Sequence, residues 1–342
     1  MERQMEPLGS LTLRNAPPPD SFITVGGVRI GIKTTLKYLG IVLDSRWDFG
    51  PHLRALTPKL VRTAGALSQL LPNLGGPNIT CRKLYTGIVR SMALYGAPIW
   101  GNNLTVRKAA LLQKPQRALA VRVIRGYRTI SGEAATLLAQ TLPWKYEARV
   151  LAQLYTWRQV QARGGDLSLK EQREQLRRAV LTDWLHSLGS PTAGHELIAA
   201  IRPVFWDWLE RRHGVFSYRL TQVLTGHGCF GKYLCRIGRE LTGGCHHCAN
   251  PEDDAKHTLL DCPAWANDRR DLVANLDGQA LSLPAIISAM VGRESAWLAV
   301  ATYCETVMSA KEAAEREREV TTDNPSRRRR LVRRRQNDLR PP

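Results

Sequence analysis

The 342-residue sequence has no apolar run that approaches the roughly 18 residues needed to cross a membrane. Its first 20 residues contain no apolar core of the kind that defines a secretory signal peptide, which argues against secretion. No glycine-rich phosphate-binding loop and no Ser-His-Asp arrangement is present, so nothing supports a P-loop NTPase or a serine hydrolase. Internal repeats are also missing. These absences favour an intracellular chain without these two enzyme activities.

Paired carboxylates on adjacent strands, which a two-metal polymerase needs to hold its Mg²⁺ ions, are missing as well. The acids near predicted strands are Asp44 and Asp48. Asp253 and Asp254 lie in a cysteine-rich loop, where hydration is the simple interpretation of their charge. We therefore expect that this chain does not catalyse phosphoryl transfer by itself.

Acidic residues are few: 30 Asp and Glu stand against 49 Lys and Arg, which gives a formal net charge of +19. A surplus of this size indicates an acidic partner rather than a particular fold. Nucleic acid is the commonest such partner, and an anionic membrane surface is the alternative. A purely structural helical protein is a weaker interpretation, because a scaffold needs no such charge.

Hydrophobic periodicity predicts a mainly α-helical chain with a small N-terminal β unit. Alternating apolar and polar residues around Gly26-Gly27 predict a hairpin, and residues 38–44 predict a third strand. A helix follows from about residue 52, and Thr80 is a candidate N-cap for the next one. The apolar face expected for this second helix consists of Leu84, Ile88, Met92 and Tyr95. Further helical patterns cover about 106–125, 131–141, 144–163, 168–187, 192–212, 215–225 and 266–318.

Seven cysteines, an odd number in a chain without a signal peptide, indicate free thiols or metal ligands rather than disulfides. The spacing C-x2-C-x8-H-x4-C, a standard ligand set for structural Zn²⁺, is formed by Cys245, Cys248, His257 and Cys262. With all four corners filled by protein, no position is left for a catalytic water. Metal binding would help to fold a segment that has few apolar residues of its own.

Alternatives to this ligand set remain open at this stage. His246 and His247 lie between the first two cysteines, and either is an alternative to His257 as the histidine ligand. Cys229 and Cys235 lie just upstream, and we interpret them as small buried hydrophobic residues. Scattered thiols without a metal are the alternative for the whole segment. A zinc module by itself does not decide function, because such modules both bind nucleic acid and serve as structural staples.

Two basic segments are candidate phosphate contacts. The first places Arg117, Arg122, Arg125 and Arg128 among apolar residues, with Tyr127 as an aromatic ring able to stack on a base. A solvated helix face is the alternative for these arginines. The second is the tail, which includes Arg327, Arg328, Arg329 and Arg330 and reads as a phosphate-binding arm, a nuclear localisation signal, or both. A merely solvating tail is the alternative.

Five stretches together resemble the C-terminal part of the reverse transcriptase of non-LTR (LINE-like) retrotransposons, most of all the type-1 elements of arthropods that insert into ribosomal RNA genes. They are KYLGIVLD at 37–44, LYGAPIW at 94–100, GYRTISGEAA at 126–135, LTGHGCF at 224–230, and the four Cys/His positions with PAW at 263–265. The resemblance covers about residues 20–300. The family's catalytic aspartates have no counterpart in this sequence.

The resemblance implies the end of a polymerase palm, a thumb-like helical bundle and a zinc knuckle. The expected organisation is a flexible leader at 1–20, a palm-end β unit at 21–50, a thumb-like and linker region at 51–225, a CCHC zinc knuckle at 226–265, C-terminal helices at 266–320 and a basic tail at 321–342. The chain then reads as a piece of a longer polyprotein or as a degenerate copy with its own start codon.

The resemblance also implies the function. The complete polyprotein is an RNA-directed DNA polymerase with an endonuclease, and Mg²⁺ is needed only there. This chain is expected to hold structural Zn²⁺ and to bind template RNA and primer or target DNA during target-primed reverse transcription in the nucleus. The alternative is a stand-alone zinc-containing nucleic-acid-binding protein.

Overall fold

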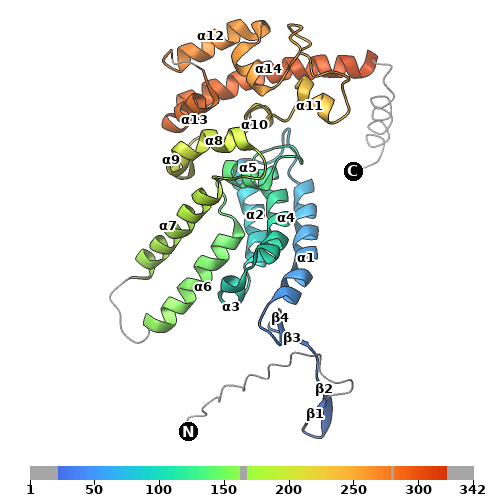
Figure 1. Ribbon diagram of the computed structural model, residues 1–342, viewed down its shortest axis with the longest axis vertical. Coiled ribbons are helices and arrows are strands. Elements are labelled where there is room, and N and C mark those ends of the chain that lie inside the picture. Colours follow the sequence, from blue (N-terminus) through green and yellow to red (C-terminus); the bar gives the residue numbers. More distant parts are fainter. Residues whose placement is uncertain (1–21, 162–167, 279–280, 322–342) are drawn as a thin grey trace.

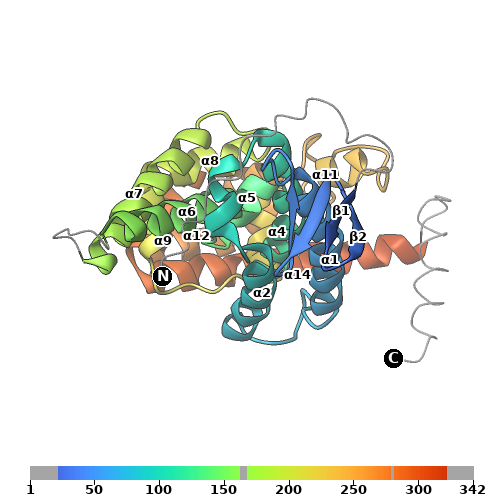
Figure 2. The same ribbon diagram turned by 90° about the horizontal axis from the view of Figure 1, so that it is seen from below.

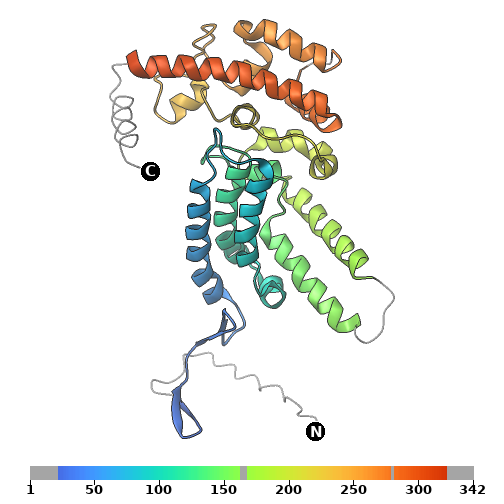
Figure 3. The same cartoon turned by 180° about the vertical axis from the view of Figure 1, so that it is seen from behind.

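The computed structural model describes residues 22–161, 168–278 and 281–321 of the chain. These residues form an elongated, mainly helical molecule with a small β unit at one end, as the periodicity predicted (Figure 1). A bundle of helices occupies the middle, and a second group of helices covers the end far from the hairpins (Figure 3). Within the described residues, no helix is both long enough and apolar enough to span a membrane.

The first hairpin confirms the prediction made from Gly26-Gly27. Strands β1 (Phe22–Val25) and β2 (Val28–Gly31) pair antiparallel, with Val25 opposite Val28. Gly26 and Gly27 have φ of +56° and +79°, the left-handed values that a two-residue turn of this hand requires at both positions.

The third strand predicted over 38–44 is confirmed only for its second half, because a turn interrupts the predicted range. Strands β3 (Thr35–Tyr38) and β4 (Ile41–Asp44) form another antiparallel hairpin, and Leu39 and Gly40 between them have φ of +46° and +84°. The Asp44 carboxylate then accepts hydrogen bonds from the backbone N–H groups of Arg46, Asp48 and Phe49 and leads the chain into the next helix. Asp44 is thus accounted for as a turn residue.

Helices α1 to α7 form the middle bundle. They are α1 (Gly50–Gln69), α2 (Ile79–Ala93), α3 (Ala97–Trp100), α4 (Val106–Val123), α5 (Gly132–Leu138), α6 (Trp144–Gln161) and α7 (Leu169–Ser187). Helix α4 belongs to two hydrophobic cores at once. Leu112 and Leu119 pack in the core nearer the hairpins, whereas Val121 and Ile124 at its end pack in the second core.

Helix α2 departs from the sequence expectation in its cap and in its buried face. Asn78, not Thr80, is the N-cap, and its side chain accepts a hydrogen bond from the Cys81 N–H at 3.0 Å. Val89 and Ala93 are fully buried, whereas Leu84 and Ile88 are exposed. The periodicity marked the helix correctly but not the face that packs inward.

The remaining helices form the end opposite the hairpins. They are α8 (His195–Ile201), α9 (Phe205–Glu210), α10 (Tyr218–Thr225), α11 (Gly231–Arg236), α12 (Ala266–Asn275), α13 (Leu283–Gly292) and α14 (Glu294–Thr321). The single helix expected over 192–212 is broken into α8, a 3-10 turn and α9, where Pro203 lacks the backbone donor that a continuous helix needs. Helices α10, α12 and α13 pack against α14, which runs across the far side of the molecule (Figure 2).

Candidate functional site

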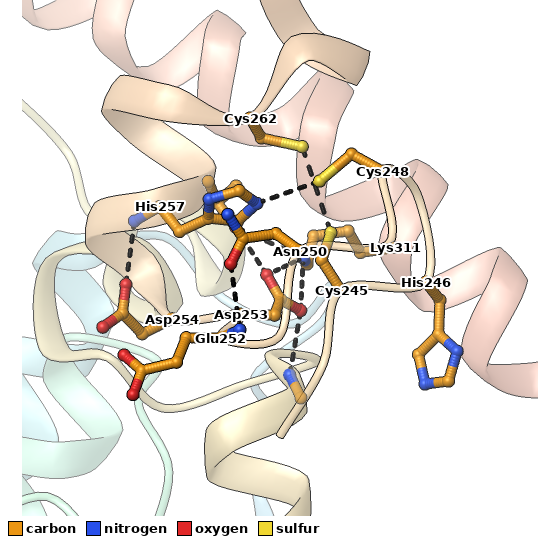
Figure 4. A network of polar contacts seen from close by, with 12 residues as sticks. Cys245, His246, Cys248, Asn250, Glu252, Asp253, Asp254, His257, Cys262 and Lys311 are labelled. Atoms are coloured by element: carbon orange, nitrogen blue, oxygen red, sulfur yellow. Dashed lines mark hydrogen bonds and ion pairs between the residues drawn. The ribbon is translucent and has the colours of Figure 1, made fainter. Parts of the chain in front are cut away.

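The four predicted metal ligands converge on one point. The ligand atoms of Cys245, Cys248, His257 and Cys262 all lie within 4.8 Å of one another (Figure 4). The Sγ atoms of Cys245 and Cys262 are 3.9 Å apart, and the Sγ of Cys248 is 3.3 Å from Nε2 of His257. A tetrahedral Zn²⁺ with Zn–S bonds of about 2.3 Å places two sulfur ligands about 3.8 Å apart. The donor set and its spacing therefore fit Zn²⁺.

The backbone around the first two ligands forms a tight knuckle. The N–H of Cys245 donates to the carbonyl of Asn250 at 2.8 Å, and the N–H of Ala249 donates back to the carbonyl of Cys245 at 3.0 Å. Ala249 takes a left-handed φ of +58° to close this turn. The closed turn directs the side chains of Cys245 and Cys248 to the same side.

The other two ligands come from a π-helical turn, η3 (His257–Asp261). The N–H of Cys262 donates to the carbonyl of His257 at 2.8 Å, and this five-residue hydrogen bond brings Cys262 next to His257. Asp254 starts the turn, because its carboxylate accepts the His257 N–H at 2.8 Å. Such π turns are frequent at functional sites because they redirect side chains.

Burial raises the pKa of Cys262 to about 12 and also raises the pKa of Cys245. At Cys248 burial again favours the neutral thiol, but the backbone N–H of Asn250 and the neighbouring thiols outweigh it and lower the pKa. Thiols in such a setting bind a metal as thiolates, so a divalent cation would supply the positive charge that these buried groups lack.

The alternative ligands lie elsewhere. His246 points away from the cluster and its Nε2 is 3.2 Å from Glu240 (Figure 4). His247 packs against Trp265 with ring centroids 4.9 Å apart. Cys229 packs against the hydrophobic core, and Cys235 is half-buried with its thiol 3.7 Å from the carbonyl of Leu241. Neither cysteine joins the four-residue group.

The interpretation of Asp253 as a hydrated surface acid is wrong. Asp253 is 2% exposed, and its carboxylate accepts hydrogen bonds from Lys311 on α14, from the Gly231 N–H and from the Thr258 hydroxyl. Lys311 is equally buried at 2%. Sequence reasoning missed this pair because its members are 58 residues apart and no local pattern connects them.

Two further residues hold the ligand segment in place. Arg269 on α12 donates to the carbonyls of Leu259 and Cys262 and so secures the end of the π turn. Gly231 is required by close approach, because a Cβ there would lie 2.3 Å from the carbonyl oxygen of Gly244. The segment 245–262, which we call the metal-ligand segment, is therefore anchored to α11, α12 and α14 by contacts that do not involve a metal.

Two of the predicted arginines, Arg122 and Arg125, contact the loop 72–77, and an arginine that was not predicted, Arg82, binds the same loop. Arg82 is fully buried and donates to the carbonyls of Pro72, Gly75, Pro77 and Arg122. Arg122 donates to the Asn73 side chain, and Arg125 donates to the carbonyls of Asn73, Gly75 and Pro77. We refer to Arg82, Arg122, Arg125 and Arg128 as the arginine cluster.

The arginine cluster has no acidic partner within ion-pair distance in the described part of the chain. Burial, together with the positive charges of Arg125 and Arg122, lowers the pKa of Arg82 to about 10. The pKa of Arg122 is lowered by burial and by Arg128. Positive charge thus accumulates here without neutralisation, and Arg128 presents it to solvent.

The other predicted contacts divide into two groups. Arg117 donates to the carbonyls of Ile130 and Arg128, and thereby holds the segment that follows α4. The ring of Tyr127 stacks on Tyr218 and meets Tyr233 edge-on, so packing within the protein accounts for it. The tail arginines Arg327, Arg328, Arg329 and Arg330 lie outside the described residues.

Fold and site together define a mainly helical protein with a Cys3His cluster that can hold a metal ion and with an unneutralised group of arginines. Over 274 residues the chain is 31% identical to a retrovirus-related Pol polyprotein from type-1 retrotransposable element R1 of Bradysia coprophila. Over 310 residues it is 25% identical to a Pol polyprotein from element R1 4 of Nasonia vitripennis. The chain is therefore a relative of the Pol polyproteins of arthropod type-1 retrotransposable elements, as its motifs predicted.

These matches differ in how much of each protein they cover. They include 75% of this chain and 26% of the Bradysia protein, but 86% of this chain and 76% of the Nasonia protein. A shorter match, 35% identical over 91 residues, joins 26% of this chain to 10% of a probable RNA-directed DNA polymerase from transposon BS of Drosophila melanogaster. The chain thus spans about a quarter of the length of the Bradysia relative. No family model and no solved structure matches the chain.

Proposed function

We propose that this chain is the nucleic-acid-binding C-terminal part of a retrotransposon reverse transcriptase. In this role it grips template RNA and primer or target DNA during target-primed reverse transcription. The observation that carries the proposal is the arginine cluster, which concentrates positive charge without acidic partners in a relative of Pol polyproteins. Guanidinium groups in such a setting suit the phosphate backbone, which they contact largely without reading sequence.

Within this proposal the parts of the molecule have separate tasks. Hairpins β1–β4 correspond to the end of the polymerase palm, and the bundle α1–α7 acts as the thumb. The Cys3His cluster holds a structural Zn²⁺ that joins the knuckle of Cys245 and Cys248 to the π turn of His257 and Cys262. The catalytic carboxylates, their Mg²⁺ ions and the endonuclease belong to the complete polyprotein. Because its target is chromosomal DNA, the protein acts in the nucleus.

The proposal is tested by measuring binding of the purified chain to a labelled RNA–DNA hybrid at increasing salt. Affinity is expected to fall steeply, by a slope of about 0.7–0.9 per phosphate contact in a double-logarithmic plot. Affinity that stays flat between low and moderate salt would contradict the proposal.

Primer extension on the same hybrid with Mg²⁺ and nucleotides provides the second measurement. Binding without product is the expected result. Template-dependent product would show that this chain contains a polymerase metal site of its own, and would overturn the assignment as a binding part.

A further inference from the structure

A pocket of about 940 Å³ opens where the metal-ligand segment meets the helices. We call it the junction pocket. It lies between the segment 129–134, the starts of α8 and α13, the end of α10, helix α11 and the η3 turn. Two stretches that carry the family resemblance, 126–135 and 224–230, both contribute to its wall. The proposed function assigns no task to this hollow.

The inner surface of the junction pocket is apolar and includes an aromatic ring. Leu224, Leu259 and Tyr233 are buried core residues that reach its floor. The His227 ring meets the Tyr233 ring edge-on, with centroids 5.2 Å apart. Surfaces of this kind accommodate flat, weakly polar groups.

The rim of the junction pocket is cationic. Arg236 and Lys256 are both exposed, and neither has a carboxylate within ion-pair distance among the residues that the structure describes. The Arg236 guanidinium lies 5.1 Å from the centroid of Tyr233, so the charge sits directly beside this aromatic ring. Glu196 is the acidic residue in the lining.

His227 adds a directed polar atom. Its Nδ1 lies 2.7 Å from the carbonyl of Thr225, which can only accept, so Nδ1 carries the proton and Nε2 is an acceptor. Burial lowers the pKa of His227, and the positive charge of Arg236 lowers it further, so the ring stays neutral near pH 7. A neutral acceptor next to an apolar floor suits the exocyclic amine or ring N–H of a base.

We propose that the junction pocket takes an unpaired nucleotide of a single strand, with its base against the apolar floor and its phosphate at Arg236 and Lys256. The inference rests on the proposed function and adds a subsite to it. A base needs an apolar stacking surface and a phosphate needs cations, and the pocket offers both side by side. Thr129 in its wall directly follows Arg128, so the pocket adjoins the exposed member of the arginine cluster. Paired bases are stacked inside a duplex and cannot enter.

The test compares three labelled probes: an unstructured single-stranded RNA, the DNA of the same sequence, and a blunt RNA–DNA hybrid. The full-length variant Arg236→Ala with Lys256→Ala removes the rim charges. The matched control, Lys170→Ala with Arg173→Ala, removes the same charge from exposed positions on α7. In the rim variant, the salt slope of single-strand binding is expected to fall by about 1.4, which is about 0.7 for each lost phosphate contact. Binding of the hybrid is expected to stay unchanged. An equal loss in the control would overturn the proposal.

A second variant fills the pocket without changing charge. Leu260→Trp places a large ring in the lining and is expected to weaken single-strand binding by about tenfold while leaving hybrid binding intact. Thermal unfolding checks that Leu260→Trp folds. If Leu260→Trp does not fold, the rim variant, which alters exposed side chains only, tests the proposal by itself. If the pocket variants weaken binding of single-stranded RNA and DNA alike, the pocket recognises base and phosphate. If they weaken binding of RNA alone, the pocket also recognises the 2′-hydroxyl.

The outcomes separate this inference from the proposed function. Salt-sensitive hybrid binding with single-strand binding untouched by both pocket variants overturns the junction-pocket proposal alone. Wild-type protein that binds no hybrid overturns the proposed function. An acidic peptide that competes with single strands on the wild type but not on Leu260→Trp would show that the pocket takes peptide, and would also overturn the inference.

Discussion

Lys311 on α14 and Asp253 in the metal-ligand segment form a buried ion pair, with Nζ 2.7 Å from Oδ1 and 2.8 Å from Oδ2 (Figure 4). The Asp253 carboxylate is also hydrogen-bonded by the Gly231 N–H at 2.8 Å, and both residues contact the Thr258 hydroxyl. The pair connects three segments far apart in the sequence. It therefore fixes the Cys3His cluster against α14 through protein contacts alone.

Replacing Lys311 with Met should strongly destabilise the protein, because Asp253 would remain buried without its counter-charge. Removing one partner of a buried pair costs about 3–5 kcal/mol. Urea unfolding measures this, with the exposed Lys256→Met as the control, expected within about 0.5 kcal/mol of wild type. Adding Asp253→Asn to Lys311→Met should recover part of the loss. Equal stability of Lys311→Met and the control would show that the pair does not hold the segment.

The purified chain should contain a single Zn²⁺, measurable as metal content after dialysis. Cys262→Ser and His257→Ala should lose the metal, since each removes one corner of a site whose ligand atoms lie within 4.8 Å of one another. The controls Cys229→Ser and His246→Ala should retain it, because their side chains lie outside the cluster. Zinc retained by His257→Ala but lost by His246→Ala would reverse the ligand assignment.

Arg82→Ala should destabilise the middle bundle by about 3 kcal/mol or more, because each buried carbonyl left without a donor costs about 1–3 kcal/mol. Arg82→Lys should restore less than half of this, since an ammonium group cannot reproduce the fork that serves four carbonyls. Chemical unfolding of both variants is compared with exposed Lys83→Ala. A stable Arg82→Ala would mean that the loop 72–77 does not depend on this guanidinium.

Arg128→Ala should weaken binding to the RNA–DNA hybrid and lower the salt slope by about 0.9, the contribution of one phosphate contact. Arg128 is the exposed member of the arginine cluster, so its removal leaves the internal hydrogen bonds of Arg82, Arg122 and Arg125 in place. Anisotropy titrations at several salt concentrations measure both quantities. Arg177→Ala on the exposed side of α7 is the control. An unchanged slope in Arg128→Ala would remove this side chain from the interface.

Stability should fall as the pH drops below about 6.5, in part through His52. His52 is 5% exposed, its Nδ1 accepts the Val42 N–H at 3.3 Å, and burial followed by the charge of Lys59 lowers its pKa from the usual 6.5. The unfolded chain therefore binds a proton that the folded chain excludes, and the loss cannot exceed about 1.4 kcal/mol per pH unit from this group. Unfolding of His52→Gln between about pH 7.5 and 5.5 should show a shallower dependence than wild type, whereas exposed His186→Gln should not. Parallel curves for wild type and His52→Gln would contradict the assignment.

Features encoded within a few residues were predictable from the sequence alone. The Gly26-Gly27 hairpin, the helical character of most of the chain and the Cys3His ligand set all depend on local sterics or on short spacings, which act in the same way wherever the segment lies. The resemblance to type-1 retrotransposable elements likewise rests on short motifs. Even so, the turn at Leu39-Gly40 was missed, because an apolar run can be read as one strand across a break.

What only the tertiary structure decided involves residues distant in the sequence. The choice of His257 over His246, the inward face of α2, the burial of Arg82 and the pairing of Lys311 with Asp253 depend on which elements pack together. Periodicity shows that a residue lies on one side of a helix but not what that side meets. A charge becomes buried only when neighbouring elements supply its hydrogen-bond partners, and those partners, such as the loop carbonyls around Arg82, exist as a set only in the folded chain.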